Sequence, residues 1–375
     1  MNPLVEPAAA RHPAASPGDA REREVLERID RFRARQPRFK DSRITMSHGA
    51  GGKASRALVE GLIVPKLTSP ALAELGDAGI VELGGVRLAM TSDTFVVRPI
   101  RFPGGSIGEL AVNGTVNDLA VAGARPRYIS LSLVLEEGLD AAELEREIDA
   151  IARAARAAHV DVVTGDTKVV ERGHADSMYI CTTGIGALDR RATLSSRALR
   201  PGDRILLSGP IGEHGTAILL ARGELGLAAD VVSDTRSLWP VVDALLEEVG
   251  PFLRTMRDAT RGGVASVLNE LAAASGVAVT VDEKCVPVSA DVQGACELLG
   301  IDPMYVANEG KLVAAVAPEA ADAALAALRA VPGCEAAALV ATVGEAPAGL
   351  VLVDTAFGGR RVVDLLVGDP LPRIC

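Results

Sequence analysis

The chain has 375 residues, of which 48% are apolar and 3% aromatic, and its formal net charge at pH 7 is −10. A chain of this length can bury a core in two domains, and an acidic chain without a basic stripe is a poor partner for nucleic acid. No apolar run reaches the roughly 18 residues that cross a bilayer, and no apolar signal core follows the N-terminal charges, so we expect a cytoplasmic protein without membrane contact.

The N-terminal part of the chain predicts an extension followed by a first domain. Residues 1–43 are rich in Arg, Ala, Pro and Glu with little apolar face, which is typical of a mobile segment. From residue 44 to residue 190, apolar strands alternate with longer helical patterns, which predicts one α/β domain. The predicted elements are strand 86–92, helix 106–122, strand 128–135, helix 141–158, strand 160–164 and strand 179–188.

A second α/β domain is predicted over residues 200–358, because the run from Arg200 to Asp203 contains Pro and Gly and interrupts the pattern. Its predicted elements are strand 204–208, helix 262–274, strand 277–281, helix 290–299, strand 312–316, helix 320–330 and strands near residues 339 and 351. The fold class is therefore α/β (α+β) with two domains. Residues 359–375 are predicted to form a flexible tail, whose prolines favour extended backbone.

A glycine-rich run from Ser47 to Lys53 opens the first domain. Bare backbone amides beside a lysine suit a polyphosphate, although a flexible turn is the simpler alternative. The run is not a Walker A loop, which needs Gly where Ser47 stands and Ser or Thr where Ala54 stands. The candidate nucleotide-binding residues of this run are His48, Gly49, Gly51, Gly52 and Lys53.

Three aspartates interrupt elements that otherwise look buried. Asp93 follows the strand 86–92, Asp166 follows the strand 160–164, and Asp118 lies beside Asn117 in a small, apolar helix. Ligands of open α/β sheets bind at the carboxyl ends of strands, and hard oxygen ligands of this kind hold Mg²⁺ against ATP phosphates. Each aspartate taken singly could instead cap a turn or form a salt bridge.

Three further segments carry candidate chemistry. Lys168 could neutralise phosphate charge or act as a general base, and an exposed surface lysine is the alternative. The run from Asp258 to Gly263 leads into a helix, and capping of that helix explains Asp258 and Thr260. Capping does not explain Arg261-Gly262-Gly263, whose glycines would admit a close anion. Glu309, between Asn and Gly before an apolar strand, indicates either an active-site turn or a plain turn.

The last residue, Cys375, is a thiol on a proline-stiffened tail. The five cysteines contain no Cys-x-x-Cys pair, which argues against a zinc knuckle or a disulfide framework. From Gly359 the tail would extend by roughly 50 Å at about 3.3 Å per residue, far enough for Cys375 to act as a carrier group in its own site or a partner's. A chance terminal cysteine is the alternative.

In this order, the motifs resemble the HypE family, the carbamoyl dehydratases of nickel–iron hydrogenase maturation, within the superfamily of aminoimidazole ribonucleotide synthetase and selenophosphate synthetase. The resemblance covers residues 44–375, and the terminal Pro372-Arg373-Ile374-Cys375 points to this branch. The other motifs are His48-Gly49-Ala50-Gly51-Gly52-Lys53, Thr91-Ser92-Asp93, Val116-Asn117-Asp118-Leu119, Thr164-Gly165-Asp166-Thr167-Lys168-Val169-Val170, Asp258-Ala259-Thr260-Arg261-Gly262-Gly263 and Asn308-Glu309-Gly310-Lys311.

The resemblance implies a synthetase-like fold whose N-terminal domains pair in a homodimer, with ATP and Mg²⁺ in an interdomain and intersubunit cleft. It implies metal binding by Asp93, Asp118 and Asp166. It implies nucleotide contacts by the glycine-rich run together with Asn117, Thr167, Asp258, Arg261 and Gly262. The N-terminal extension departs from the family pattern.

The resemblance also implies a reaction cycle. A HypF-type carbamoyltransferase loads a carbamoyl group onto Cys375, ATP phosphorylates its oxygen, and loss of the N–H protons leaves a thiocyanate that a HypC–HypD scaffold receives. Lys168 and Glu309 are the candidates for holding the amide and taking its protons. A sister enzyme, such as aminoimidazole ribonucleotide synthetase or thiamine phosphate kinase, would act on a free small molecule without Cys375, and a non-enzymatic assembly protein would show no ATP turnover.

Overall fold

The computed structural model describes residues 38–223, 230–368 and 373–375. Most of the predicted N-terminal extension therefore lies outside the described residues. The chain first forms a short 3-10 helix, Met46–Gly49, and a helical arm that comprises α2 (Lys53–Leu58), α3 (Val64–Leu67) and α4 (Pro70–Ala73). None of the helices within these described ranges has the length and apolarity that a membrane span requires.

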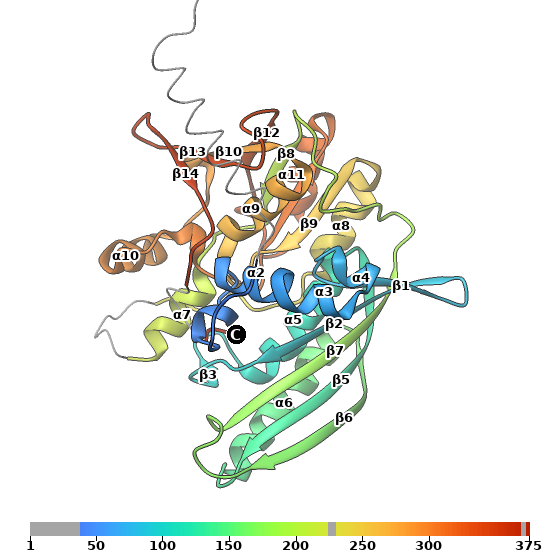
Figure 1. Cartoon of the computed structure of the whole chain (residues 1–375), viewed down its shortest axis with the longest axis vertical. Helices are drawn as coiled ribbons and strands as arrows, with labels where there is room; N and C mark the ends of the chain where they lie inside the picture. The colour runs from blue at the N-terminus through green and yellow to red at the C-terminus, as the bar shows by residue number, and fades with distance from the viewer. Residues whose placement is uncertain (1–37, 224–229, 369–372) are drawn as a thin grey trace, which may run out of the picture.

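The first sheet has five strands in the order β1-β2-β7-β5-β6. Its strands are β1 (Gly79–Leu83), β2 (Val86–Phe95), β5 (Ala124–Glu136), β6 (Asp161–Val170) and β7 (Met178–Leu188), and β5 and β6 are parallel while the other neighbours are antiparallel. The helices α5 (Ile107–Val121) and α6 (Ala141–Ala157) cover one face, and β6 forms a free edge (Figure 1). A two-stranded ribbon, β3 (Arg101–Phe102) and β4 (Gly105–Ser106), leads into α5.

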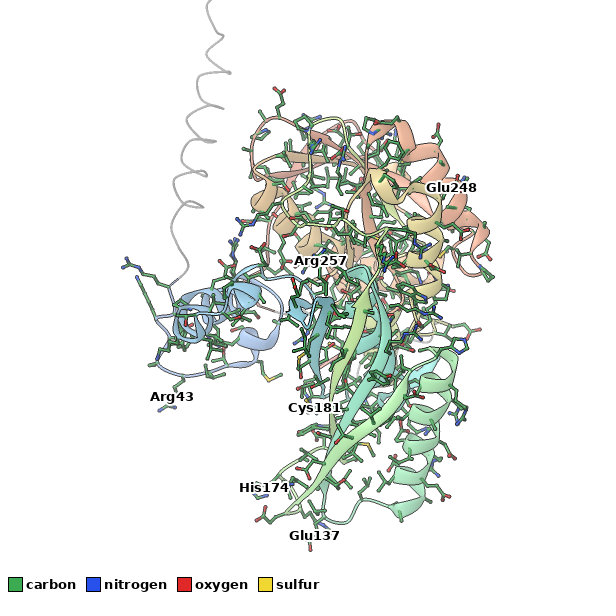
Figure 2. All side chains as sticks on the ribbon, turned by 90° about the vertical axis from the view of Figure 1, so that its right-hand side faces the viewer. Arg43, Glu137, His174, Cys181, Glu248 and Arg257 are labelled. Carbon is green, nitrogen blue, oxygen red and sulfur yellow. The ribbon has the colours of Figure 1, made fainter. Side chains whose placement is uncertain are left out.

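The opposite face of this sheet is open. Figure 2 shows α6 on one side of the sheet and Cys181 of β7 on the other. Cross-strand partners share a face, so the register assigns a set of exposed apolar side chains to the open face. This set, which we call the open apolar face, is Val81, Leu83, Val86, Met90, Tyr128 and Ile185.

The second sheet has seven strands in the order β14-β13-β10-β12-β8-β11-β9. Its strands are β8 (Arg204–Leu207), β9 (Leu253–Asp258), β10 (Ala278–Asp282), β11 (Leu312–Val316), β12 (Ala338–Gly344), β13 (Val351–Asp354) and β14 (Arg360–Val363). The helices are α7 (Glu213–Ala221), α8 (Trp239–Val249), α9 (Gly263–Ser275), α10 (Ala290–Leu299) and α11 (Ala321–Ala330). Alternate residues of β8 enter two cores: Leu207 packs with α9, and Leu206 packs with α8 and α11.

Several sequence-based boundaries need correction. The strand predicted at 160–164 continues to Val170, and the strand predicted at 86–92 continues to Phe95, so their polar residues lie inside strands and not after them. A polar side chain does not end a strand when it points into a cleft or to solvent, because the hydrogen-bond ladder uses only the main chain. The elements α7, α8, β9 and β14 were not predicted.

The C-terminal tail is also more ordered than predicted. Residues Arg360–Val363 form β14 against β13, which contradicts a flexible segment that begins at residue 359. Beyond β14 the chain crosses the glycine-rich run: Lys53 N donates to Leu366 O at 2.8 Å. The last described residues, 373–375, pack against the end of β2. The tail therefore closes over the first domain.

Candidate active site

Three carboxylates from distant parts of the chain meet where the two domains join. Asp77 lies in the loop before β1, Asp118 lies in the last turn of α5, and Asp258 ends β9. One carboxylate oxygen from each of the three residues lies within 4.8 Å of those of the other two. Thr91 Oγ1 of β2 donates to Asp118 Oδ2 at 2.6 Å. We call Asp77, Asp118 and Asp258 the acidic cluster, and its oxygen donors suit a hard divalent cation.

Burial dominates the electrostatics of the acidic cluster. It raises the pKa of Asp118 and of Asp258 well above the usual value, and repulsion from neighbouring carboxylates adds to both shifts. Burial also raises the pKa of Asp77 to about 6, although Arg257, whose Nε lies 2.8 Å from Asp77 Oδ2, opposes the shift. One guanidinium cannot offset three carboxylates, and a divalent cation would favour their ionised forms.

Asp93 adds negative charge beside the acidic cluster. It pairs across the sheet with Thr182, whose hydroxyl bonds a carbonyl of α5, so Asp93 shares the face of the sheet that α5 covers. Burial is the main cause that raises the pKa of Asp93, while Arg261 opposes the shift. The charge of Asp93 in turn raises the pKa of Asp118. Two of the three predicted metal ligands therefore lie together.

The third predicted metal ligand, Asp166, lies on the other face of the same sheet. Asp166 pairs with Ser132, which pairs with Cys181, and this register places it on the open side of β6. There its carboxylate accepts a hydrogen bond from Lys168, which is the main cause that lowers the pKa of Asp166. Within a single chain, therefore, Asp166, Lys168 and their neighbour Thr167 lie away from the acidic cluster.

Glu309 is a buried acid on the turn before β11. The residue is 3% exposed, and its Oε1 has no hydrogen-bond partner among the residues that the structure describes. Burial, followed by repulsion from Asp258 and Asp234, raises the pKa of Glu309 well above the usual value. An unpaired carboxyl group beside other acids is a common arrangement for proton exchange with a ligand.

The main chain of this turn is held firmly. Asp234 accepts hydrogen bonds from Glu309 N at 3.0 Å and from Gly310 N at 3.3 Å. Lys311 Nζ donates to Asp234 Oδ2 at 3.1 Å and to Glu213 Oε2 at 2.9 Å. A Cβ atom on Gly310 would lie 1.8 Å from Asp234 O, so only glycine fits there. The turn positions Glu309 while leaving its carboxyl group available.

Asn117 is engaged in joining the domains. Its Nδ2 donates to Glu309 O and to Arg236 O, both at 3.0 Å, and its Oδ1 accepts from Leu238 N at 2.7 Å. These three bonds link α5 to two loops of the second domain. The structure therefore shows Asn117 linking the two domains, and its nucleotide contact stays a prediction.

The glycine-rich run packs against the segment that follows Asp258. Arg261 donates from a guanidinium nitrogen to Gly49 O at 2.7 Å. A Cβ atom on Gly51, whose φ is +76°, would lie 3.0 Å from Arg261 O, and one on Gly262, whose φ is also +76°, would lie 2.1 Å from Ser266 Oγ. Both glycines are required by positive φ and close approach. The two predicted nucleotide-binding segments therefore form one surface.

The side chains of His48 and Lys53 have partners inside the chain. His48 is buried, with Nε2 2.9 Å from Asp41 Oδ2. Lys53 Nζ forms an ion pair with Asp364 Oδ2 at 2.7 Å, and a Cβ atom on Gly52 would lie 2.3 Å from the carbonyl oxygen of a tail residue. The tail therefore covers the run that was expected to bind phosphate.

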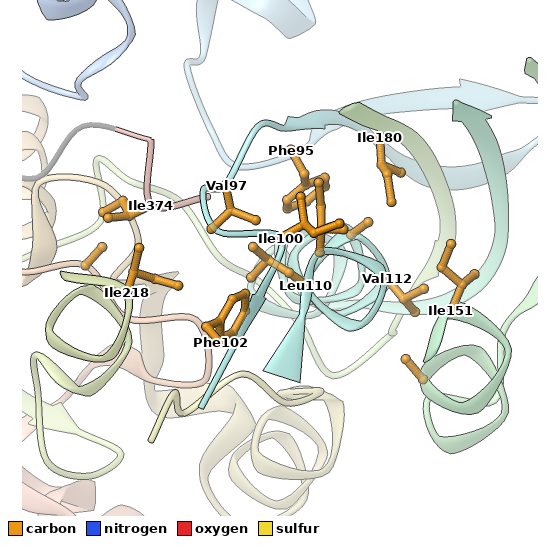
Figure 3. Close-up of a cluster of buried hydrophobic side chains, with 14 of the residues drawn as sticks. Phe95, Val97, Ile100, Phe102, Leu110, Val112, Ile151, Ile180, Ile218 and Ile374 are labelled. Carbon is orange, nitrogen blue, oxygen red and sulfur yellow. The ribbon is translucent and has the colours of Figure 1, made fainter. Parts of the chain in front are cut away.

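The terminal cysteine is docked beside β2. Val96 N donates to Cys375 O at 3.1 Å, and Arg98 N donates to Arg373 O at 3.2 Å, which is the pattern of a short antiparallel strand. Between them, the Ile374 side chain is 2% exposed and enters the apolar cluster drawn in Figure 3. Val96 directly follows β2, and Asp93 lies three residues earlier on that strand, so the tail ends roughly 10 Å along the backbone from Asp93.

Two residues of the site escaped the sequence analysis. Asp77 stands between Gly76 and Ala78 before an unpredicted strand, which is the pattern of an ordinary turn. Asp234 lies in an irregular stretch with no apolar period around it. The one available signal was the position of Asp77 at a strand entrance, and many surface turns share that signal.

Family models match both halves of the chain. The N-terminal domain of the AIR synthase related proteins matches residues 75–188, and the C-terminal domain matches residues 200–353. A thiamine monophosphate kinase of Aquifex aeolicus, 21% identical with a TM-score of 0.60 over 80% of this chain and 96% of that one, shares the fold.

Curated relatives are similar along almost their whole length. The carbamoyl dehydratase HypE of Rhizobium leguminosarum bv. viciae is 48% identical over 335 residues, which cover 89% of this chain and 96% of that protein. The HypE of Escherichia coli K12 is 44% identical over 337 residues, which cover 88% of this chain and 99% of that protein.

Solved structures agree with the curated relatives. A HypE in complex with ATP is 48% identical, with a TM-score of 0.74 over 89% of this chain and all of that one. A HypE from a HypE–HypF complex is 38% identical, with a TM-score of 0.78 over 83% of this chain and all of that one. With this coverage, these identities and the site described above, the chain belongs to the HypE family of AIR synthase related proteins.

Proposed function

We propose that the chain is an ATP-dependent carbamoyl dehydratase, a hydro-lyase of hydrogenase maturation that acts on a carbamoyl group carried by Cys375. The observation that carries the proposal is the docked tail, whose terminal cysteine lies beside β2, the strand that holds Asp93. A sister enzyme that acts on a free small molecule would have no use for this arrangement. Relatives named carbamoyl dehydratase support the same activity.

The reaction balances as follows. The carbamoyl thioester, –S–C(=O)–NH₂, receives the γ-phosphoryl group of ATP on its oxygen, which turns a poor leaving group into phosphate. Both N–H hydrogens are then lost as protons while the C–O bond breaks, and the products are –S–C≡N, ADP and phosphate. No oxidant or reductant is needed. The chain must therefore bind ATP, hold the thiocarbamate and accept protons.

Glu309 is the proposed proton acceptor. Its raised pKa suits a group that takes a proton near neutral pH, and its braced main chain keeps the carboxyl group in place. Burial excludes water that would compete for the reacting group. Glu309 therefore combines basicity with a fixed position.

We further propose that Mg²⁺ and ATP bind between the acidic cluster and the surface of the glycine-rich run. The residues fit a divalent cation, because Asp77, Asp118 and Asp258 bring buried carboxylate oxygens together. Arg257 balances only part of their negative charge. Bound there, the cation would offset charge on the transferred phosphoryl group. Lys53 would join the nucleotide after leaving its ion pair with Asp364, while Arg261, Gly262 and the amides of the run would face the phosphates.

A homodimer is part of the proposal. Six exposed apolar side chains gather on the open apolar face, and soluble monomers rarely expose a contiguous patch of this kind. Asp166 and Lys168 lie on the same side of the sheet, so pairing through this face would present them to a second copy. We propose that the Asp166 carboxylate, the main chain of Thr167 and the Lys168 amine complete the partner's site, as a metal ligand, a nucleotide contact and a contact to the thiocarbamate. Only the main chain of Thr167 is proposed, because its side chain points to the other face of the sheet.

The expected partners follow from the same scheme. We propose that a HypF-type carbamoyltransferase loads Cys375 and that a HypC–HypD scaffold accepts the nitrile, with all steps in the cytoplasm. The complex of a related HypE with HypF supports the first contact. We propose that the tail leaves its docked position for loading, because the Cys375 thiol is partly buried in this fold.

Intact mass spectrometry tests the proposed function. The protein is incubated with the carbamoyltransferase, carbamoyl phosphate and ATP, and wild type is compared with Cys375→Ala and with Cys285→Ala, a control at an exposed cysteine. Wild type and the control should gain a carbamoyl mass that then loses one water, and Cys375→Ala should gain neither. An adduct of equal yield on Cys375→Ala, or none on wild type with an active partner, would contradict the proposal.

A further inference from the structure

One buried side chain, His214, binds the main chain of the docked tail from the second domain. His214 lies in the first turn of α7 and is fully buried. Its Nε2 lies 2.7 Å from Ile374 O, and its Nδ1 lies 2.8 Å from Ser233 Oγ. The ring stands edge-on to Phe102 with centroids 5.5 Å apart. Both ring nitrogens are thus satisfied only while the tail is docked.

The two partners select one tautomer of His214. A carbonyl oxygen only accepts, so Nε2 carries the hydrogen and donates to Ile374 O. Ser233 Oγ accepts from Thr235 N at 3.2 Å and can therefore donate its own hydrogen to Nδ1. Burial is the main cause that lowers the pKa of His214, in agreement with a neutral ring. When the tail leaves, a buried N–H loses its acceptor, which favours the docked state.

The contacts of His214 are continuous with the turn that holds Glu309. Glu213, the preceding residue, accepts a hydrogen bond from the lysine of that turn at 2.9 Å. Asp234, which follows Ser233, accepts from Glu309 N at 3.0 Å. The same two short segments therefore hold both the tail and the proposed proton acceptor.

Arg222, the residue that follows α7, assists from the other end of the helix. Arg222 NH2 donates to Arg373 O at 2.9 Å, and its Nε donates to Arg98 O at 3.0 Å. The carbonyl groups of all three terminal residues thus accept hydrogen bonds, two of them from the side chains of His214 and Arg222 at the two ends of α7. Because these contacts use main-chain atoms, they fix the path of the tail without touching the Cys375 thiol.

We propose that His214 is a positioning residue for dehydration: by holding the Ile374 carbonyl, it keeps Cys375, and the carbamoyl group on it, in the docked position in which water is lost. The inference rests on the proposed function. Loading takes place with the tail released, so His214 acts on the loss of water and not on the transfer of the carbamoyl group. It touches neither the nucleotide site nor the reacting atoms.

The test separates the two half-reactions in variants of His214. His214→Phe keeps a ring against Phe102 and removes both hydrogen bonds, His214→Gln restores an amide donor near Nε2, and Ser233→Ala removes the group that fixes the tautomer. The sum of carbamoylated and dehydrated protein over time, measured by intact mass, reports loading. The loss of one water reports dehydration. Peptide mapping after iodoacetamide treatment of the free protein reports the exposure of Cys375.

We expect His214→Phe to dehydrate about tenfold more slowly and to alkylate at Cys375 about tenfold faster, with loading no slower than wild type. His214→Gln should bring both the dehydration rate and the alkylation rate most of the way back to wild type. Ser233→Ala should change both rates in the same direction as His214→Phe, by a smaller factor. Wild-type alkylation and dehydration rates in His214→Phe would overturn the proposal. So would a parallel fall in loading, dehydration and ATP affinity with a lower Tm, which would assign His214 to stability alone.

The outcomes also separate this inference from the proposed function. If wild type is loaded and never loses water, the proposed function fails, while the alkylation rates still report whether His214 holds the tail. If wild type loses water and His214→Phe does so equally fast, the proposed function stands and the positioning part of His214 is wrong.

Discussion

The acidic cluster and the Asp166–Lys168 pair contain the same kinds of groups in opposite environments. Asp118 is enclosed where the domains join, and burial raises its pKa well above the usual value. Asp166 is exposed on β6, and the hydrogen bond from Lys168 lowers its pKa. Alternation along the strands places Asp93 and Asp166 on opposite faces of one sheet.

The comparison separates two kinds of functional residue. A buried acid whose charge is not fully balanced stores unfavourable electrostatic energy, which a cation or a proton can relieve inside one chain. An exposed pair has little energetic influence on its own chain and acquires a function only when a second surface covers it. The motifs therefore contain two groups of residues. The acidic cluster is proposed to act in its own chain, and the Asp166–Lys168 pair is proposed to act in the site of a partner chain.

The largest effect is expected at Glu309. Glu309→Gln removes the proposed proton acceptor and should slow dehydration by about 10²-fold or more, the usual range for a general base, while loading of Cys375 continues. Intact mass would then show accumulation of the carbamoylated form. Glu319→Gln, at an exposed glutamate, is the control and should behave like wild type. Dehydration at the wild-type rate in Glu309→Gln would remove Glu309 from the mechanism.

The next test asks whether Lys168 serves the site of its partner. Lys168→Ala and Glu309→Gln should each be inactive in dehydration, but mixed dimers should contain one site with both native residues. An equal mixture, after subunit exchange, should recover about a quarter of wild-type activity, because half of the dimers are mixed and half of their sites are intact.

The contrary results of the mixing test are equally clear. No recovery, with mixed dimers verified by mass, would mean that Lys168 and Glu309 act from one chain, or that Lys168 acts elsewhere. A monomeric protein in sedimentation would contradict the pairing through the open apolar face.

As a check on that face, Met90→Glu should weaken dimerisation because it places a charge among apolar side chains.

A third, smaller effect concerns pH and magnesium. Burial raises the pKa of Asp77 to about 6, so the folded protein holds more protons than the unfolded chain between about pH 4 and pH 6. The contribution of proton binding at Asp77 to the free energy of unfolding is fully present below about pH 4 and is lost as the pH rises through 6. The raised pKa values of Asp118 and Asp258 act in the same direction.

Magnesium should restore that stability where the carboxylates are ionised. The gain in Tm on adding Mg²⁺, at constant ionic strength, should therefore be larger at pH 7.5 than at pH 5.5, with about 1–2 °C for each kcal/mol in a chain of this length. Differential scanning calorimetry measures it. An equal gain at both pH values would show that Mg²⁺ does not bind at the acidic cluster.

The smallest effect is expected at Asp166. Without divalent cations, Asp166→Asn should leave Tm unchanged, since the side chain is exposed. Asp118→Asn, in contrast, should raise Tm at pH 7.5 and abolish the gain from Mg²⁺, because it removes a buried charge that only a cation offsets. A decrease in Tm for Asp166→Asn as large as the change for Asp118→Asn would contradict the distinction between the two regions.

Much of the fold was predictable because apolar periodicity is a local signal. The helices at 141–158 and 290–299 and the strand at 312–316 agree with α6, α10 and β11 to within one residue. The errors fall where polar residues occupy strands: the sequence pattern predicts that Asp93 and Asp166 follow a strand, but each lies inside one. The strand β14 was missed because two arginines begin it, and an edge strand tolerates them in solvent.

The candidate site was predictable in part. The motifs named Asp118, Asp258 and Glu309, which the fold does bring to the domain junction, because helix-terminal and strand-terminal acids are visible in the sequence. Asp77 was not visible, since its place beside Asp118 depends on how β1 pairs with β2. The use of Asn117 as a link between domains likewise depends on loops more than 100 residues away.

By itself, the sequence determined the alternation of strands and helices, the family motifs and a cysteine at the end of the chain, because each of these is written in neighbouring residues. Only the tertiary structure decided which acids share a site, that Asp166 faces away from Asp118, and that the tail docks under His214. These features depend on strand register and on contacts between residues that are far apart in the chain, and the free energy that selects them comes from burying surfaces no local segment contains.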